Sequence, residues 1–225
     1  MRWFERLEAH ALSRKLDPAA SVFHFVRHGE TAENRARICQ GQNDVPLNAD
    51  GMAQAERAAP LLAAMPVKRL VASDLRRVQM TIAPLLAATG WPMEKDVALR
   101  ERCFGPRQGR PLEDDHWEAS EPGVETIEDF VQRICDCLQR ELHEDHVLLA
   151  AHGGVLRVIA AALDTPLQHW AYTNALPMTF RRNGGAWSVE AMTPEHRLDA
   201  LAPLPEGVTA GDPTTAADLD NAPVT

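Results

Sequence analysis

A short apolar run that ends abruptly in charged residues constrains this chain more than any other stretch. Residues 22–26 read Val-Phe-His-Phe-Val, and Arg27, His28 and Gly29 follow at once. β-branched and aromatic residues favour a buried strand, and a glycine among polar residues favours a turn out of it. The pattern therefore places Arg27 and His28 at the carboxyl end of a core strand, where ligands bind in open α/β sheets.

Two other stretches repeat this arrangement. Residues 146–151 form a continuous apolar run that ends in His152, Gly153 and Gly154, and the short run 69–73 leads into a helix start. Apolar residues at helical spacing predict helices between and after these strands, and residues 177–192 predict a hairpin. Strands that alternate with helices indicate an α/β fold, a three-layer sandwich with a mostly parallel central sheet flanked by helices. The predicted helices cover residues 1–16, 51–65, 74–89, 125–143 and 155–163, with Asn48 or Asp50 capping the second and Ser73 or Asp74 the third.

The length of 225 residues fits one domain with extensions. We expect an N-terminal helical extension over residues 1–20 and a main domain over residues 21–200. The segment 97–123 lacks periodicity and reads as a loop or lid, and residues 203–225 have the composition of a disordered tail.

The composition of the chain argues against several classes of function. A net charge of −9 argues against a nucleic-acid binder, and no apolar run is long enough to span a membrane. The four cysteines match no zinc or thioredoxin spacing, so we expect reduced thiols in a cytoplasmic protein. The histidines show no metal-ligand spacing, so neither a metal nor a cofactor is predicted.

If both His-Gly strands belong to one parallel sheet, His28 and His152 emerge at the same edge. Arg27, an arginine at the start of the 74–89 helix, and Glu101 would join them. Guanidinium groups hold phosphate oxygens, an imidazole can carry a phosphoryl group, and a carboxyl group can donate a proton. This set of side chains is typical of phosphoryl transfer.

The run Arg27-His28-Gly29-Glu30-Thr31, followed by Asn34, resembles the opening motif of the histidine phosphatase superfamily, which has the phosphoglycerate-mutase-like fold. The resemblance implies that His28 is the phosphorylated nucleophile and Glu101 the proton donor. It implies that Arg27, Arg76 and His152 complete a catalytic phosphate pocket. Further substrate contacts would come from four residues: Asn34, Gln40, Gly41 and Gly153.

The arginine at the helix start has two alternatives. An S-x-x-R spacing from Ser73 selects Arg76, whereas an S-x-L-x-R spacing selects Arg77. Helix-start geometry favours Arg76, which is the residue we expect in the pocket.

The resemblance favours the phosphatase branch, because the segment between Glu101 and His152 is short and Gln40 precedes Gly41. We expect metal-independent hydrolysis of a small phosphorylated metabolite through a phosphohistidine, in a monomer or homodimer. Two alternatives remain: a cofactor-dependent phosphoglycerate mutase, and a catalytically silent domain that binds a phosphorylated ligand. Four residues of the 97–123 segment form either a specificity pocket or a solvated lid: Arg107, Arg110, His116 and Trp117.

Overall fold

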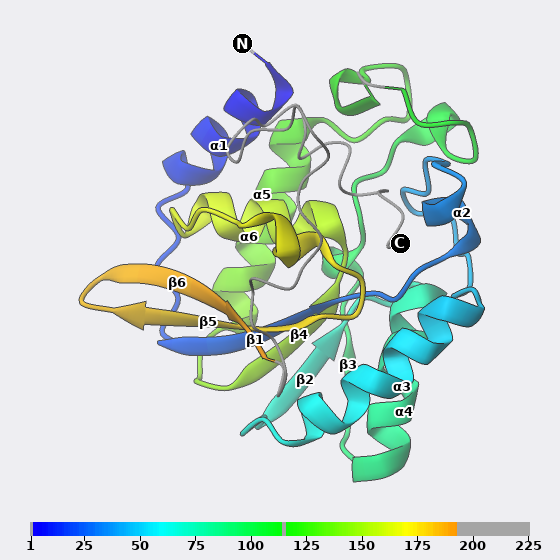
Figure 1. Cartoon of the computed structure of the whole chain (residues 1–225). Coiled ribbons are helices and arrows are strands. Elements are labelled where there is room, and N and C mark those ends of the chain that lie inside the picture. Colours follow the sequence, from blue (N-terminus) through cyan, green and yellow to red (C-terminus); the bar gives the residue numbers. More distant parts are fainter. Residues whose placement is uncertain (1, 114–115, 193–225) are drawn as a thin grey trace.

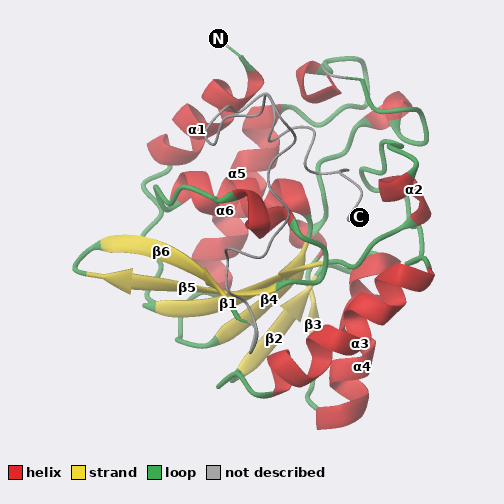
Figure 2. Ribbon diagram, in the orientation of Figure 1, coloured by secondary structure: helices red, strands yellow, loops and turns green. Residues whose placement is uncertain are grey.

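A six-stranded sheet forms the centre of the part of the chain that the computed structural model describes, residues 2–113 and 116–192 (Figures 1 and 2). Its strand order is β3-β2-β4-β1-β5-β6. The first four strands run parallel, β5 runs antiparallel to β1, and β6 antiparallel to β5. The predicted mostly parallel sheet is confirmed. The strands are β1 (Val22–Arg27), β2 (Arg69–Ala72), β3 (Glu94–Lys95), β4 (Val147–Ala151), β5 (Pro177–Asn183) and β6 (Ala186–Ala191).

Helices cover both faces of the sheet, which gives the predicted three layers. Helices α3 and α4 pack together on one face, and α1, α5 and α6 pack on the other (Figure 1). The helices are α1 (Trp3–Ser13), α2 (Ala32–Arg35), α3 (Ala49–Ala63), α4 (Arg76–Thr89), α5 (Ile127–Glu141) and α6 (Gly153–Ala162). Short 3-10 helices occur at η1 (Val97–Leu99), η2 (Gly105–Arg107), η3 (His116–Glu118) and η4 (His169–Tyr172). None of the helices in the described residues is both long and apolar enough to cross a membrane.

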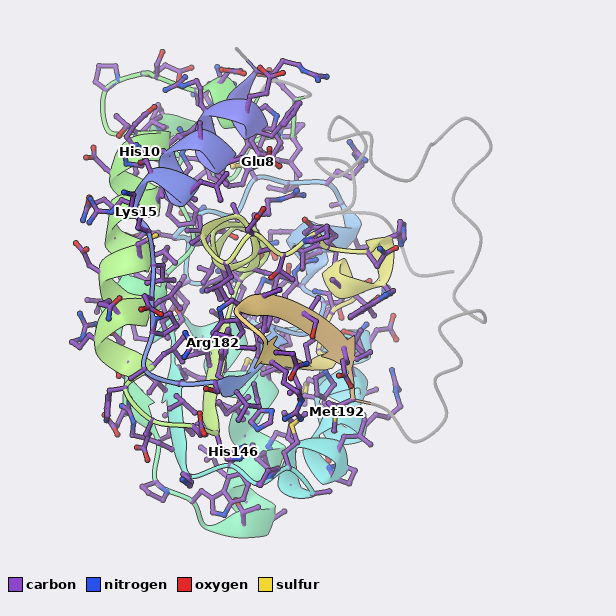
Figure 3. The ribbon with its side chains drawn as sticks, turned by 90° about the vertical axis from the view of Figure 1, so that its left-hand side faces the viewer. Glu8, His10, Lys15, His146, Arg182 and Met192 are labelled. Atoms are coloured by element: carbon purple, nitrogen blue, oxygen red, sulfur yellow. The ribbon has the colours of Figure 1, made fainter. Side chains whose placement is uncertain are left out.

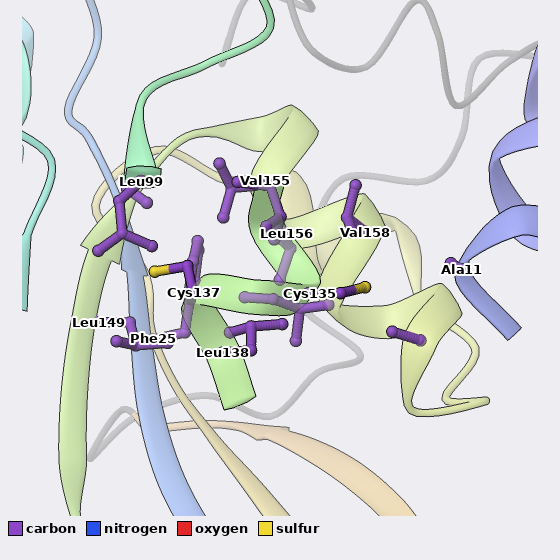
Figure 4. Packing of buried hydrophobic residues seen from close by; sticks show 14 of the residues in the cluster. Ala11, Phe25, Leu99, Cys135, Cys137, Leu138, Leu149, Val155, Leu156 and Val158 are labelled. Atoms are coloured by element: carbon purple, nitrogen blue, oxygen red, sulfur yellow. The ribbon is translucent and has the colours of Figure 1, made fainter. Parts of the chain in front are cut away.

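The larger core lies between the sheet and the α1, α5 and α6 layer. Figure 4 shows Leu138 of α5 and Leu156 of α6, which belong to the same buried cluster as Phe25 and Leu149 of the central strands. All four side chains are fully buried. Apolar residues at period 3.6 on the helices and continuous apolar strands meet here, as the sequence pattern requires.

The N-terminal helix is part of this core. Its buried residues are Trp3, Phe4, Leu7 and Ala11, and they face α5 and α6. Leu12 of the same helix is 47% exposed. Figure 3 looks onto this side of the molecule, where Glu8 and Lys15 lie at the surface.

The two central strands bring the His-Gly turns together. In β1 and β4, Arg27 pairs with Ala151 in parallel register, so His28 and His152 follow their strands at the same level. The His28 N–H donates to Ala151 O at 3.0 Å, which extends the ladder by one residue. Both imidazoles therefore leave the sheet at its carboxyl edge, as predicted.

Local details differ from expectation in two places. The N-cap of α4 is Leu75, not Ser73 or Asp74, and Asp44 Oδ1 accepts a hydrogen bond from the Arg76 N–H instead. The exposed two-residue strand β3 was not predicted. Of the two predicted caps of α3, Asn48 or Asp50, the structure has Asn48, whose Oδ1 accepts a hydrogen bond from the Gly51 N–H. The predicted tail, 203–225, lies outside the described residues.

Candidate active site

A pocket opens at the carboxyl edge of the sheet and gathers most of the predicted side chains. It encloses about 430 Å³, including its opening to solvent. Its lining comes from β1, from the loop after it, from the start of α4 and from the 97–123 segment. The lining residues are Arg27, His28, Asn34, Ile38, Cys39, Gln40, Gly41, Arg77, Glu101, Phe104, Leu112, His116 and Trp117.

His28 is buried and has one ring nitrogen fixed. Its Nδ1 lies 2.8 Å from Gly29 O. A carbonyl oxygen can only accept, so Nδ1 carries the proton and Nε2 keeps its lone pair. Burial holds the pKa of His28 well below its usual range, and the charges of Arg77 and Arg27 lower it further. The imidazole is therefore neutral and has the tautomer that a nucleophile requires.

His152 lies against His28, with ring centroids 5.3 Å apart and planes tilted by 58°. Its Nε2 is 2.9 Å from Ser73 Oγ. Its Nδ1 is buried without a hydrogen-bond partner among the described residues. Burial first, and then Arg77 and His28, lower the pKa of His152 well below its usual range. His152 contacts His28 as predicted, although it stands behind the pocket wall.

The second arginine of the pocket is Arg77, and the expectation of Arg76 is wrong. Arg76 is exposed, whereas Arg77 is buried and lines the pocket. Helix α4 begins at Arg76, and successive helical residues point about 100° apart, so only the second one turns inward.

Backbone oxygens hold both pocket arginines. Arg77 donates from its two terminal nitrogens to Gly41 O and Asn43 O, each at 2.8 Å. Burial lowers the pKa of Arg77 to about 10, so the group stays charged at neutral pH. Arg27 donates from Nη1 to Tyr172 O at 2.6 Å. These bonds fix two cations in a buried pocket before any anion binds.

Glu101 lies on the wall of the same pocket. Its Oε2 accepts from the Gly154 N–H at 2.9 Å, and its Oε1 accepts from the Arg102 N–H at 2.8 Å. A Cβ on Gly154 would stand 2.2 Å from Oε1, so glycine is required for this close approach. The carboxyl group is thus held by the first turn of α6, the helix that follows His152.

Three of the four predicted substrate contacts line the pocket. Asn34, Gln40 and Gly41 line the pocket, but Gly153 is buried at the start of α6 and does not. Gln40 Oε1 is buried without a partner among the described residues, which leaves its amide available to a ligand. Asn34 Oδ1 accepts from the Thr31 N–H at 3.1 Å, so the capping of α2 fixes this residue.

The 97–123 segment contributes a wall that sequence reasoning only partly identified. His116 and Trp117 line the pocket, which agrees with the alternative of a specificity pocket. Arg110 is exposed, and Arg107 pairs with Glu121. The apolar lining residues Ile38, Cys39, Phe104 and Leu112 were missed. They lie in irregular segments, where no periodicity marks an inward-facing side chain.

Arg27, His28, Arg77 and Glu101 line the pocket at the sheet edge, and His152 contacts His28. Guanidinium groups, an imidazole and a carboxyl group are the side chains that phosphoryl transfer uses, and the fold is phosphoglycerate-mutase-like. The family model of the histidine phosphatase superfamily (branch 1) matches residues 23–193. The chain belongs to this superfamily, and the predicted resemblance is confirmed.

Individual relatives carry different names. Agropine synthesis reductase of Rhizobium rhizogenes is 36% identical over 77% of this chain and 43% of its own length. An uncharacterized phosphatase, PhoE, of Bacillus subtilis is 30% identical over 67% of this chain and 83% of its own. A 2,3-bisphosphoglycerate-dependent phosphoglycerate mutase of Xanthobacter autotrophicus is 31% identical over 64% and 81%. The chain thus spans less than half of the agropine synthesis reductases that it matches.

Solved structures agree with this assignment. The mycobacterial glucosyl-3-phosphoglycerate phosphatase has a TM-score of 0.60 and 27% identity, and the match covers 76% of this chain and 97% of that one.

Proposed function

We propose that this protein hydrolyses a phosphomonoester of a small metabolite through a phosphohistidine at His28. The observation that carries the proposal is the His28 ring itself. Its Nδ1 faces Gly29 O at 2.8 Å, so the lone pair of Nε2 is available in a pocket that holds two guanidinium groups. Relatives of both kinds, phosphatases and mutases, support phosphoryl transfer as the reaction class.

In the first step, His28 Nε2 attacks phosphorus and the bond from phosphorus to the leaving oxygen breaks. Arg27 and Arg77 neutralise the charge on the remaining phosphoryl oxygens. Glu101, in its acid form, gives its proton to the leaving oxygen, so the product leaves as a neutral alcohol. The phosphoryl group stays on Nε2.

In the second step, the Glu101 carboxylate takes a proton from water, and the resulting hydroxide attacks phosphorus. The N–P bond breaks, His28 regains its lone pair, and inorganic phosphate leaves. His152 supports His28 from outside the pocket lining: the two ring centroids lie 5.3 Å apart, and His152 Nε2 lies 2.9 Å from Ser73 Oγ. The amide of Gln40 supplies a further contact.

The test is phosphate release from 4-nitrophenyl phosphate by the wild type and by His28→Ala. We expect the variant to lose at least about 10³-fold in kcat, because no other described pocket residue offers a neutral imidazole nitrogen beside both arginines. Wild-type enzyme quenched in an alkaline denaturant should also carry bound phosphate that is stable to alkali and is released by acid. Undiminished turnover by His28→Ala would overturn the proposal.

The mutase alternative is separated by incubation with 3-phosphoglycerate and 2,3-bisphosphoglycerate. Hydrolysis releases inorganic phosphate, whereas a mutase forms 2-phosphoglycerate at constant total ester phosphate. We expect phosphate release to exceed isomerisation.

A further inference from the structure

One wall of the pocket is aromatic and apolar. Phe104 and Trp117 meet edge to face with ring centroids 5.6 Å apart, and His116 lies 5.6 Å from Phe104. Ile38, Cys39 and Leu112 complete this aromatic wall. A planar or apolar group attached to the phosphate would find a complementary surface here.

The arginines nearest this wall are engaged elsewhere. Arg102 donates to Trp117 O at 2.6 Å and to Ala119 O at 3.2 Å, so its charge lies behind the wall. Arg107 makes ion pairs with Glu121 at 2.8 Å and Glu113 at 3.4 Å. In residues 2–113 and 116–192, Arg27 and Arg77 are the only lysine or arginine residues that line the pocket.

The N-terminal helix braces the aromatic wall from outside. The Trp3 ring stacks on Trp117 with centroids 4.8 Å apart and planes 18° from parallel. The Trp3 N–H donates to Glu118 Oε1 at 2.7 Å. Arg6 reaches the same segment through an ion pair with Glu118 at 3.8 Å. Helix α1 precedes the region that the family model matches, which begins at residue 23.

We infer that the substrate is a phosphomonoester whose leaving group is uncharged and apolar or planar, and that α1 positions the wall that selects it. The inference rests on the proposed function. A second anionic group placed against the aromatic wall would lie in the same pocket as Glu101, and the described lining offers it no lysine or arginine besides the two that hold the phosphate. An unpaired buried charge is costly, and a site that cannot pair a polar group rejects its carrier strongly.

A matched pair of substrates tests the leaving-group preference. 4-Methylbenzyl phosphate and 4-carboxybenzyl phosphate differ in one charge, and their leaving oxygens are chemically alike. We expect kcat/KM to be at least about 10-fold higher for the methyl compound. Equal values, or a preference for the carboxylate, would overturn this inference while the proposed function stands. Failure to release phosphate from either compound would count against the proposed function, and this inference would fall with it.

Variants test the role of α1. Trp3→Leu keeps an apolar side chain but removes the stack on Trp117, whose typical strength corresponds to about 2- to 10-fold. We expect KM for 4-methylbenzyl phosphate to rise by about that factor with kcat nearly unchanged, and the preference over the carboxyl compound to shrink. Leu12→Ala, at an exposed position of the same helix, is the control and should change neither.

A purely structural role of Trp3 would lower Tm without changing the ratio between the two substrates, and that result would refute the positioning role. Trp117→Leu alters the wall directly and provides the same comparison if Trp3→Leu does not fold. An unchanged substrate ratio in Trp117→Leu would equally refute the assignment of the wall.

Discussion

Neighbouring arginines at the start of α4 offer a sharp test of the site. Arg77 is buried in the pocket and Arg76 is exposed, so Arg77→Ala and Arg76→Ala remove the same group from positions about 100° apart on one helix turn. Of these two arginines only Arg77 lines the pocket, so the proposed function gives the phosphate contact to Arg77 and not to Arg76. The pair therefore serves as variant and matched control.

The expected size of the effect follows from what Arg77 contacts. Loss of one preorganised cation from a water-poor pocket costs about 10²- to 10³-fold in turnover, or roughly 3–4 kcal/mol of transition-state stabilisation. Arg77→Ala also lowers the free energy of unfolding, because Gly41 O and Asn43 O lose their donors. A buried carbonyl without a donor costs about 1–3 kcal/mol of stability. The variant no longer buries the Arg77 charge, and this gain offsets part of the loss in stability. We expect Arg76→Ala to stay within about twofold of the wild type.

The assay is kcat/KM for 4-nitrophenyl phosphate, with Tm measured on the same samples. Arg77→Lys is the second variant, because it keeps the charge but lacks the fork that spans both carbonyls. It should fall between the wild type and Arg77→Ala. Equal losses in Arg76→Ala and Arg77→Ala, at unchanged Tm, would refute the assignment of the pocket cation.

Two further predictions concern buried groups. Burial, then His146 and Arg181, lower the pKa of His24 to about 4, so folding favours its neutral form. The contribution of neutral His24 to the free energy of unfolding is complete above the unfolded pKa of about 6.5. It is lost as the pH falls toward 4, by about 3 kcal/mol in total. Urea unfolding should therefore show a steeper loss of stability between pH 7 and 4.5 in the wild type than in His24→Gln; parallel curves would contradict this reading. Gly154→Ala would displace Glu101 and should lower kcat by about 10-fold or more with a smaller effect on KM; an unchanged kcat would show that Glu101 tolerates the shift.

Residues 22–28 and 147–152 show which parts of the site could be predicted from sequence. Each is an apolar run followed directly by a histidine and glycine, and adjacent parallel strands must carry both ends to one edge. Local composition decides which segments become strands. Because parallel strands run in the same direction, the residues that follow them lie at the same edge of the sheet. His28 and His152 were therefore predictable as neighbours, as was the capping of α3 by Asn48.

The choice between Arg76 and Arg77 could not be made locally. Where α4 begins decides which arginine turns inward, and that start depends on Asp44, which accepts from the Arg76 N–H across 32 positions of sequence. A shift of one residue rotates a helical side chain by about 100°. The two spacing rules from Ser73 select different arginines, and neither rule contains information about this distant acceptor that would decide between them.

The aromatic wall is a second part of the site that could not be predicted from the sequence. The sequence by itself determined the strands, the amphipathic helices and the histidines at the sheet edge, because each depends on short-range periodicity and on turn-forming residues. Only the tertiary structure decided that Trp3, near the first residue, stacks on Trp117 beside the pocket. Irregular segments obtain their orientation from the surfaces that they cover, and those surfaces exist only once the chain has folded.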